Sequence, residues 1–297
     1  MSAVSRPGPS VPARVVLADL CDRFGGFLID SFGVLVDGRG ALPGAAGLLA
    51  ELARRGKPYL IVTNDASRRH ATMMERFRRF GLAVAEDRIL SSGGLIAPHF
   101  AAHGLAGARC LVLGTDDSRE LVAEAGGQVC AIDPAGDYDA VVVCDDGGFP
   151  FLDGINAALS ALFRGLDAGR DVRMILPNPD LVFPAGSGTY GFTSGSIALL
   201  LEAALARRYP ERPPRFERLG KPHRPLFDEA VRRMSGAGEL VMIGDSLETD
   251  IAGALACGID AALLVTGVTR WRGGEERGGE ARGGERVIPT YILESLS

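Results

Sequence analysis

Short apolar runs that end in a polar residue constrain the fold of this sequence more than any other feature. One such run spans residues 27–29 before Asp30, another spans 59–62 before Thr63, and a third spans 240–243 before Gly244 and Asp245. Runs of this length beside glycine are typical of buried strands. Helices are expected between them, over 44–55 and about 67–80. This alternation predicts an α/β fold with a Rossmann-like parallel sheet.

A second set of strands and helices occupies the middle of the chain. Strands are expected at 109–114, 140–144 and 172–176, with helices at 118–125 and 156–165. We interpret residues 89–192 as an α/β domain inserted into a core formed by 16–88 and 193–297. Residues 1–15, rich in Pro and Ser, are expected to be a disordered tail and neither a secretory signal nor a membrane span.

Composition excludes several classes of protein. A length of 297 residues suits about two domains, and 32 basic against 37 acidic residues give a net charge of −5. Because there is no basic block, nothing indicates a nucleic-acid or membrane partner. The five cysteines are scattered, without metal-ligand or redox spacing, and are expected to be buried thiols in a reducing cytoplasm.

The polar residues after the strands suggest a chemistry. Parallel strands that end in Asp30 and Asp245 indicate a Mg²⁺ site, because a hard cation prefers carboxylate oxygens. Thr63 adds a hydroxyl group, and Lys221 adds a cation at the start of an expected helix. A nucleophile, a metal site, a hydroxyl donor and a cation are the parts that phosphoryl transfer needs.

The order of these motifs resembles the haloacid dehalogenase superfamily of phosphohydrolases. The spacing is similar to subfamily IIA, which includes the N-acetylglucosamine phosphate, pyridoxal phosphate and p-nitrophenyl phosphate phosphatases. The similarity covers about residues 16–296 and rests on the Asp30 segment and on Val62-Thr63-Asn64, Asn178-Pro179-Asp180, Gly220-Lys221-Pro222 and Ile243-Gly244-Asp245-Ser246 with Asp250.

The resemblance implies a role for each matching position. Asp30 would attack phosphorus and form an aspartyl-phosphate, while Thr63 and Lys221 would hold the phosphoryl oxygens. Mg²⁺ would be bound by Asp30, Asp245 and the backbone carbonyl of Phe32, with Asp250 in support. The inserted domain would be a cap that selects a small phosphorylated metabolite, with Asn64, Asn178 and Asp180 in contact with the substrate.

Phe32 departs from the usual pattern, in which an aspartate two residues after the nucleophile acts as general acid and base. Such help is worth roughly 10²–10⁴-fold in rate, so its loss predicts a slow enzyme, a selective one or no hydrolase at all. The sequence resembles a minor branch of subfamily IIA with an aromatic residue here. Asp37 and Asp65 are candidate replacement acids, although ordinary loop carboxylates are the favoured interpretation.

Three functions therefore stay open: a Mg²⁺-dependent phosphatase, which is favoured; a binding or regulatory protein without turnover; and a phosphotransferase to an acceptor other than water. A homodimer is one option for the assembly. His99 and His103 can share a helix face, but without a third ligand nearby in sequence we expect simple packing. Residues 272–285, a low-complexity repeat, are expected to form a flexible loop.

Overall fold

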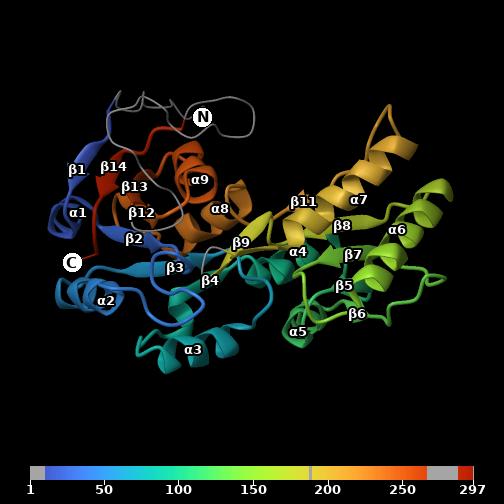
Figure 1. The fold of residues 1–297 in the computed structure, drawn as a ribbon, viewed down its shortest axis with the longest axis horizontal. Coiled ribbons are helices and arrows are strands. Elements are labelled where there is room, and N and C mark those ends of the chain that lie inside the picture. The colour runs from blue at the N-terminus through green and yellow to red at the C-terminus, as the bar shows by residue number, and fades with distance from the viewer. Residues whose placement is uncertain (1–10, 187–188, 266–286, 297) are drawn as a thin grey trace. The chain divides into compact units, whose positions relative to one another are not determined.

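The computed structural model describes residues 11–186, 189–265 and 287–296 (Figure 1). By its internal contacts the chain divides into two compact units. Unit 1 consists of Met1–Thr63, Met74–Leu90 and Lys221–Ser297, and unit 2 consists of Asn64–Met73 and Ser91–Gly220. Each unit has its own sheet, so the fold is built from two α/β bodies.

Unit 1 contains a seven-stranded sheet with the order β1-β14-β13-β12-β2-β3-β4. The hydrogen-bonded ladders from β1 through β14, β13, β12 and β2 to β3 are all parallel. The strands are β1 (Ala13–Val15), β2 (Gly26–Ile29), β3 (Tyr59–Thr63), β4 (Ile89–Ser91), β12 (Leu240–Gly244), β13 (Asp260–Leu264) and β14 (Tyr291–Leu293). The central strands are buried on both faces, as parallel strands between helices should be.

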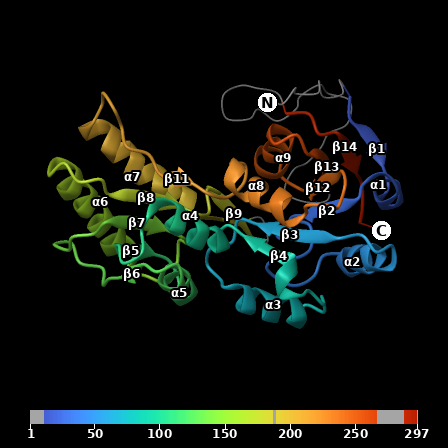
Figure 2. The ribbon, with the colours of Figure 1, turned by 180° about the vertical axis from the view of Figure 1, so that it is seen from behind.

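Helices cover both faces of this sheet. The helices α8 (Arg224–Arg233) and α9 (Ala252–Ala256) lie on one face, and α2 (Ala45–Arg54) lies on the other (Figure 2). The buried side chains of α2 are Ala45, Leu48, Leu49 and Leu52, a spacing that places them along one side of a helix. The remaining helical segments of unit 1 are α1 (Leu17–Arg23), the 3₁₀ turn Glu86–Arg88 and the π-helical turn Leu247–Ile251. Helix α3 (His70–Arg79) is divided between the units, with its residues from Met74 onward in unit 1.

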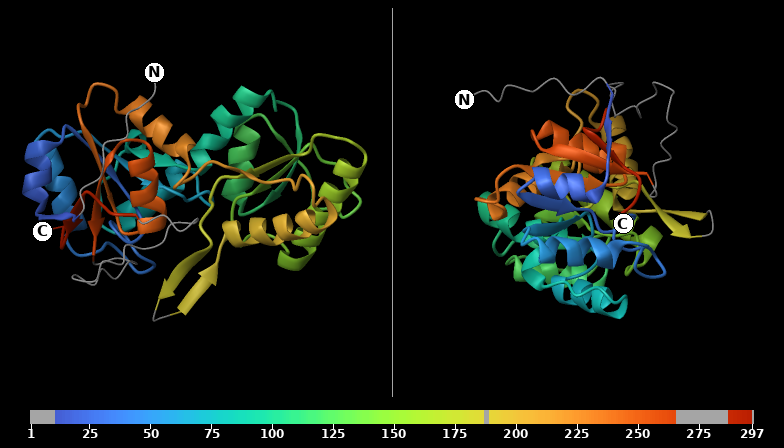
Figure 3. Two further views of the ribbon diagram at one scale, coloured as in Figure 1. Left: turned by 90° about the horizontal axis from the view of Figure 1, so that it is seen from above. Right: turned by 90° about the vertical axis from the view of Figure 1, so that its left-hand side faces the viewer.

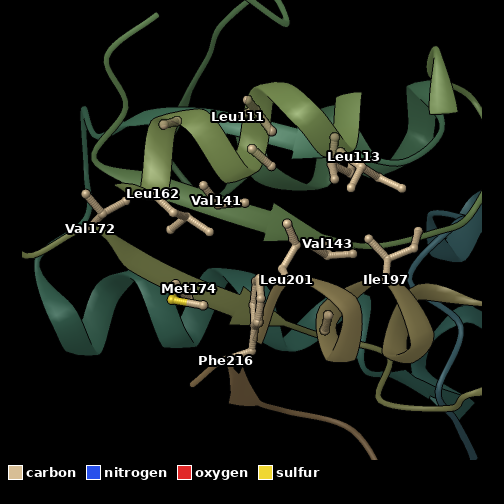
Figure 4. Packing of buried hydrophobic residues seen from close by; sticks show 14 of the residues in the cluster. Leu111, Leu113, Val141, Val143, Leu162, Val172, Met174, Ile197, Leu201 and Phe216 are labelled. Atoms are coloured by element: carbon tan, nitrogen blue, oxygen red, sulfur yellow. The ribbon is translucent and has the colours of Figure 1, made fainter. Parts of the chain in front are cut away.

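Unit 2 contains a five-stranded parallel sheet with the order β11-β8-β7-β5-β6. Its strands are β5 (Arg109–Leu113), β6 (Gln128–Val129), β7 (Ala140–Val143), β8 (Arg173–Leu176) and β11 (Glu217–Arg218). Its helical segments are the 3₁₀ turn Gly93–Leu95 and the helices α4 (Ile96–His103), α5 (Asp116–Glu124), α6 (Phe151–Asp167) and α7 (Ser194–Arg208). A hydrophobic core joins this sheet to α6 and α7, where Val141 and Val143 lie among Leu162, Ile197 and Leu201 (Figure 4).

A two-stranded antiparallel hairpin, β9 (Val182–Gly186) and β10 (Thr189–Phe192), extends from unit 2 (Figure 3). Its exposed apolar side chains are Val182, Phe183, Tyr190 and Phe192. Because these side chains point into solvent, the hairpin adds apolar surface and no core.

The structure confirms the α/β class, but its two units have other bounds than the expected domains. Unit 2 includes Asn64–Met73, expected in the core, and its main segment begins at Ser91 and not at residue 89. The second unit ends at Gly220 and not at residue 192, because α7 packs into its core and β11 pairs with β8. Residues 13–15, expected in a disordered tail, form β1 through parallel hydrogen bonds to β14. The end of unit 2 and the strand at residues 13–15 both depend on pairing with distant parts of the chain, which local sequence patterns do not show.

Two other expectations concern the segments near the end of the chain. The apolar segment at 287–293 does return to the core, since β14 is buried and pairs with β13. The low-complexity repeat at 272–285 lies outside the described residues. Within the described ranges, no helix is long and apolar enough to cross a bilayer.

Candidate active site

Three predicted site residues lie at the carboxyl ends of neighbouring strands in unit 1. Ile29 of β2 pairs with Ile243 of β12 on one side and with Ile61 of β3 on the other. Because the strands are parallel and in this register, the residues at their carboxyl ends, Asp30, Asp245 and Thr63, lie at one edge of the sheet. From β2 the chain continues to β3, whereas from β12 it continues to β13 in the opposite direction. Such a reversal of strand order is where open α/β sheets bind ligands.

Lys221 joins two of the carboxylates in a buried network. Its Nζ donates hydrogen bonds of 2.6 Å to Oδ1 of Asp30 and 2.6 Å to Oδ1 of Asp250, and one of 3.0 Å to the carbonyl oxygen of Val62. The side chains of Lys221, Asp30, Asp245 and Asp250 are all buried. The predicted nucleophile, lysine and supporting aspartate are therefore in one cluster.

Burial and charge set the protonation of this cluster. Burial lowers the pKa of Lys221, but the charges of Asp250 and Asp30 outweigh it and raise that pKa above its usual value. Burial raises the pKa of Asp30 well above its ordinary range; Lys221 opposes this shift, while Asp250 and Asp245 add to it. The site thus holds a protonated lysine among carboxylates whose mutual repulsion a further cation would reduce.

Two glycines allow this close packing. Gly33 has a φ of 97°, and a Cβ there would overlap Oδ2 of Asp245. At Gly244 a Cβ would overlap the Cβ of Asp250. The turn after Asp30 is closed by Ser31, whose carbonyl oxygen accepts the backbone N–H groups of both Leu35 and Val36. This steric requirement depends on contacts with distant residues, so the sequence pattern alone does not reveal it.

The carboxylates of Asp30, Asp245 and Asp250 form a group that can hold a metal ion. Their ligand oxygens all lie within 4.8 Å of one another, and all three side chains are buried. Hard oxygen ligands of this kind suit Mg²⁺. Phe32 lies in the adjacent turn, half-buried, and its backbone forms a bridge with Val36.

The predicted substrate-binding residues Asn64, Asn178 and Asp180 lie in unit 2. Nδ2 of Asn64 donates to Oδ1 of Asp180 at 2.9 Å. Oδ1 of Asn178 accepts the backbone N–H of Asp180 at 3.0 Å, and its Nδ2 donates to Oγ1 of Thr193 at 3.3 Å. Asn178 and Asp180 follow the carboxyl end of β8, whereas Asn64 directly follows β3 and joins them through its hydrogen bond to Asp180.

Asp37 and Asp65, the candidate replacement acids, both have local hydrogen bonds. Oδ1 of Asp37 accepts the backbone N–H groups of Arg39 and Gly40, and these bonds lower its pKa. Oδ1 of Asp65 accepts two hydrogen bonds from Ser67, and Oδ2 accepts one from Arg68. This is the turn-forming role that the sequence favoured for both.

A group of three side chains was missed. The sequence offered no third ligand for His99 and His103, but the structure places Glu217 of β11 beside them. Glu217 is far from both histidines in the sequence, so only the pairing of β11 with β8 reveals it.

Comparison with known proteins assigns the family. Residues 27–128 match the model of the haloacid dehalogenase-like hydrolases, and residues 218–297 match a second model of this hydrolase type. Human chronophin is 31% identical over 95% of this chain and 94% of its own length. The chain belongs to the haloacid dehalogenase-like hydrolases. It is therefore a hydrolase, as the motif order predicted.

Solved structures of this hydrolase family agree with the fold. A possible sugar phosphatase of Cytophaga hutchinsonii has a TM-score of 0.81 and 29% identity, covering 96% of this chain and 98% of its own. A glycerol phosphate phosphatase of Mycobacterium tuberculosis, in complex with magnesium, has a TM-score of 0.73 and 26% identity, covering 93% and 77%. These matches are consistent with subfamily IIA; the branch with an aromatic residue at position 32 stays a prediction.

Proposed function

We propose that this hydrolase removes phosphate from a small phosphorylated metabolite, such as a sugar phosphate or glycerol phosphate, through a covalent aspartyl-phosphate on Asp30. The observation that carries the proposal is the buried network in which Lys221 bridges Asp30 and Asp250 at the carboxyl edge of the sheet. The two structural relatives named above, a possible sugar phosphatase and a glycerol phosphate phosphatase, support the choice of substrate class.

In the first step, a carboxylate oxygen of Asp30 bonds to phosphorus, the bond from phosphorus to the ester oxygen breaks, and that oxygen takes a proton from solvent and leaves as the alcohol. Lys221 and Thr63 hold the phosphoryl oxygens, and the positive charge of Lys221 offsets the negative charge of the transferring group. In the second step, water attacks the phosphorus of the aspartyl-phosphate and gives a proton to solvent, the acyl phosphate bond breaks, and inorganic phosphate and the Asp30 carboxylate are released. The buried position of Asp30 keeps its nucleophilic oxygen in a fixed geometry.

Mg²⁺ fits the donor set of this site. Asp30, Asp245 and Asp250 supply buried carboxylate oxygens, and we propose Asp30, Asp245 and the carbonyl of Phe32 as ligands with Asp250 in support. A bound Mg²⁺ would neutralise charge on the phosphoryl group and orient it. The raised pKa of Asp30 reflects burial and the nearby carboxylates, which is the environment that a divalent cation relieves.

We propose that unit 2 serves as the cap and that its polar group at the end of β8 contacts the substrate. The side chains of Asn64 and Asp180 are joined by a 2.9 Å hydrogen bond. Their polar atoms are therefore oriented in the absence of a ligand. Asn178 fixes the same turn through the backbone of Asp180. A substrate with hydroxyl groups, as in sugar or glycerol phosphates, offers matching donors and acceptors.

Phe32 favours a second function, a site that binds or transfers phosphate with little hydrolysis. A phenylalanine cannot donate a proton to the leaving oxygen or take one from water. Asp37 and Asp65 are engaged in local turns, so neither is oriented by these contacts as a replacement acid. An aspartyl-phosphate in such a site would live long enough to react with an acceptor other than water.

The test is release of inorganic phosphate from a panel of sugar, glycerol and cofactor phosphates, with and without Mg²⁺. The wild type, Asp30→Asn and the matched control Asp87→Asn are compared, since Asp87 is an exposed carboxylate of unit 1. We expect Mg²⁺-dependent release by the wild type and the control, and none by Asp30→Asn. Ligand-induced thermal stabilisation without release would instead support the binding function.

We also propose a homodimer that forms through the β9-β10 hairpin. Its four exposed apolar side chains include Tyr190 and Phe192, both 71% exposed, and a second copy would bury them. Light scattering on a size-exclusion column should give a dimer for the wild type and a monomer for the double variant Tyr190→Lys, Phe192→Lys. A monomeric wild type would overturn this proposal.

A cytoplasmic location is the last part of the proposal. The thiols of all five cysteines are free, which suits a reducing compartment.

A further inference from the structure

A cluster of two histidines and one glutamate in unit 2 has the composition of a transition-metal site. His99 and His103 are one helical turn apart on α4, and Glu217 comes from β11. The two imidazole rings have centroids 4.2 Å apart. Their ligand atoms and those of Glu217 all lie within 4.8 Å of one another. This cluster shares no residue with the proposed active site.

Two ligand-to-ligand distances within the cluster are close to those around one tetrahedral ion. Oε2 of Glu217 lies 3.5 Å from Nε2 of His99 and 3.8 Å from Nε2 of His103. Two ligands bound to zinc at its usual bond length of 2.0–2.1 Å are about 3.4 Å apart in tetrahedral geometry. Each of the two measured distances is thus within a few tenths of an ångström of that spacing.

The nitrogen of His99 is the strongest single indication. Its side chain is only 10% exposed, and among the described residues its Nε2 is buried without a hydrogen-bond partner. A buried polar atom without a partner is costly unless a ligand binds it.

The surrounding contacts orient the other two ligands. Nδ1 of His103 lies 2.9 Å from the carbonyl oxygen of His99, a contact in which Nδ1 donates and Nε2 carries the lone pair. Oε1 of Glu217 accepts a hydrogen bond from Arg173, and this leaves Oε2 directed at the histidines. Such outer contacts are what fix the ligands of metal sites.

We propose that His99, His103 and Glu217 bind Zn²⁺, with solvent completing a four-coordinate site. Two imidazoles and one carboxylate suit zinc better than Mg²⁺, which prefers oxygen ligands. His103 and Glu217 are 35% and 36% exposed, so the ion can enter from solvent. The site links α4, near the start of the main segment of unit 2, to β11, near its end at Gly220. Bound zinc therefore stabilises this unit by joining its two ends.

The test is Zn²⁺ titration of the chelator-treated full chain with Mg²⁺ in excess, followed by calorimetry and thermal unfolding. We expect one tight site per chain and a rise of a few degrees in Tm. Co²⁺, as a spectroscopic probe, should show the visible absorption of tetrahedral coordination. His103→Ala and Glu217→Gln should each weaken Zn²⁺ binding by at least about 100-fold, because even outer partners of metal ligands contribute about 10–100-fold.

Two control variants make the result decisive. Glu211→Gln removes an exposed carboxylate elsewhere in unit 2 and should bind Zn²⁺ like the wild type. Asp245→Asn alters the carboxylate group of unit 1 and should also retain the tight site. Equal affinity in the wild type and His103→Ala, absence of a tight site, or its loss in Asp245→Asn would each overturn the proposal.

Discussion

The ammonium group of Lys221 lies 2.6 Å from Oδ1 of Asp30, and both side chains are buried. The same ammonium group lies 2.6 Å from Oδ1 of Asp250. One buried cation is thus shared by two carboxylates that follow different strands. Removing one member of a buried ion pair leaves an uncompensated charge, which costs far more than the loss of a surface pair.

Replacement of Lys221 should therefore destabilise unit 1 as well as abolish turnover. We expect Lys221→Met to lower the free energy of unfolding by about 3–5 kcal/mol, measured by urea denaturation. Lys57→Met is the matched control, because Lys57 also lies in a Gly-Lys-Pro triplet but its Nζ donates to the carbonyl oxygen of Phe24. Similar losses in the two variants would contradict the network argument.

Substitution of Gly33 should disturb the site through backbone strain. Gly33 has a φ of 97°, and a Cβ there would overlap the Asp245 carboxylate. We expect Gly33→Ala to cost about 1–3 kcal/mol of stability and to reduce Mg²⁺ affinity in a calorimetric titration. Gly38→Ala, in the same loop but with open space around the new Cβ, should behave like the wild type. An equal effect of both changes would point to loop flexibility instead of the contact with Asp245.

Much of the candidate site could be predicted because it lies at strand ends that strong apolar runs mark. The run before Asp30 and the run before Asp245 became β2 and β12, which are neighbours in the sheet. The sequence has two Gly-Lys-Pro triplets. They differ in position, because Lys57 lies just before β3 whereas Lys221 lies just before α8. Strands β2 and β12 could be predicted from local patterns because they are buried in the sheet and are therefore apolar.

The parts that escaped prediction depend on pairing between distant segments. Strand β1 has mostly exposed side chains and forms only because β14 offers it an edge. β11 has two residues and pairs with β8, so no periodicity reveals that Glu217 reaches His99. The hydrogen bond between Asn64 and Asp180 likewise joins residues that no spacing rule connects.

Glu202 should make the stability of unit 2 dependent on pH. It is 1% exposed and accepts hydrogen bonds from Arg215, Arg218 and the backbone N–H of Phe216. Burial raises the pKa of Glu202, but these donors outweigh it and hold that pKa below the ordinary value of 4.5. A carboxylate with a lowered folded-state pKa contributes stability above its unfolded pKa, and this contribution is lost as pH falls through the folded value.

We therefore expect Glu202→Gln to cost about 1.5–3 kcal/mol at neutral pH and much less once the pH is well below 4.5. Urea denaturation of both proteins over this pH range measures the difference. Glu211→Gln, an exposed change of the same chemistry, should show neither effect. A cost for Glu202→Gln that stays constant with pH would mean that its contribution is packing and not charge.

Restoring an acid at position 32 tests the consequence of the phenylalanine there. If the site is a phosphatase that lacks a general acid, Phe32→Asp should raise kcat by roughly 10²–10⁴-fold, the usual contribution of such a group. The half-buried position of Phe32 in the turn after Asp30 means that the substitution also removes apolar packing. Phe32→Asn is the matched control, because it has the same shape as aspartate but does not act as an acid.

The expected result is a rise in kcat for Phe32→Asp and none for Phe32→Asn, measured as the steady-state release of phosphate. In the wild type, rapid mixing with a chromogenic ester should show a burst of one product per site followed by slow turnover, since hydrolysis of the aspartyl-phosphate lacks a base. The burst should disappear in Phe32→Asp as the second step becomes fast. Unchanged kcat in a folded, Mg²⁺-binding Phe32→Asp protein would show that position 32 does not limit the reaction. If the wild type is also inactive, that result would support the binding function.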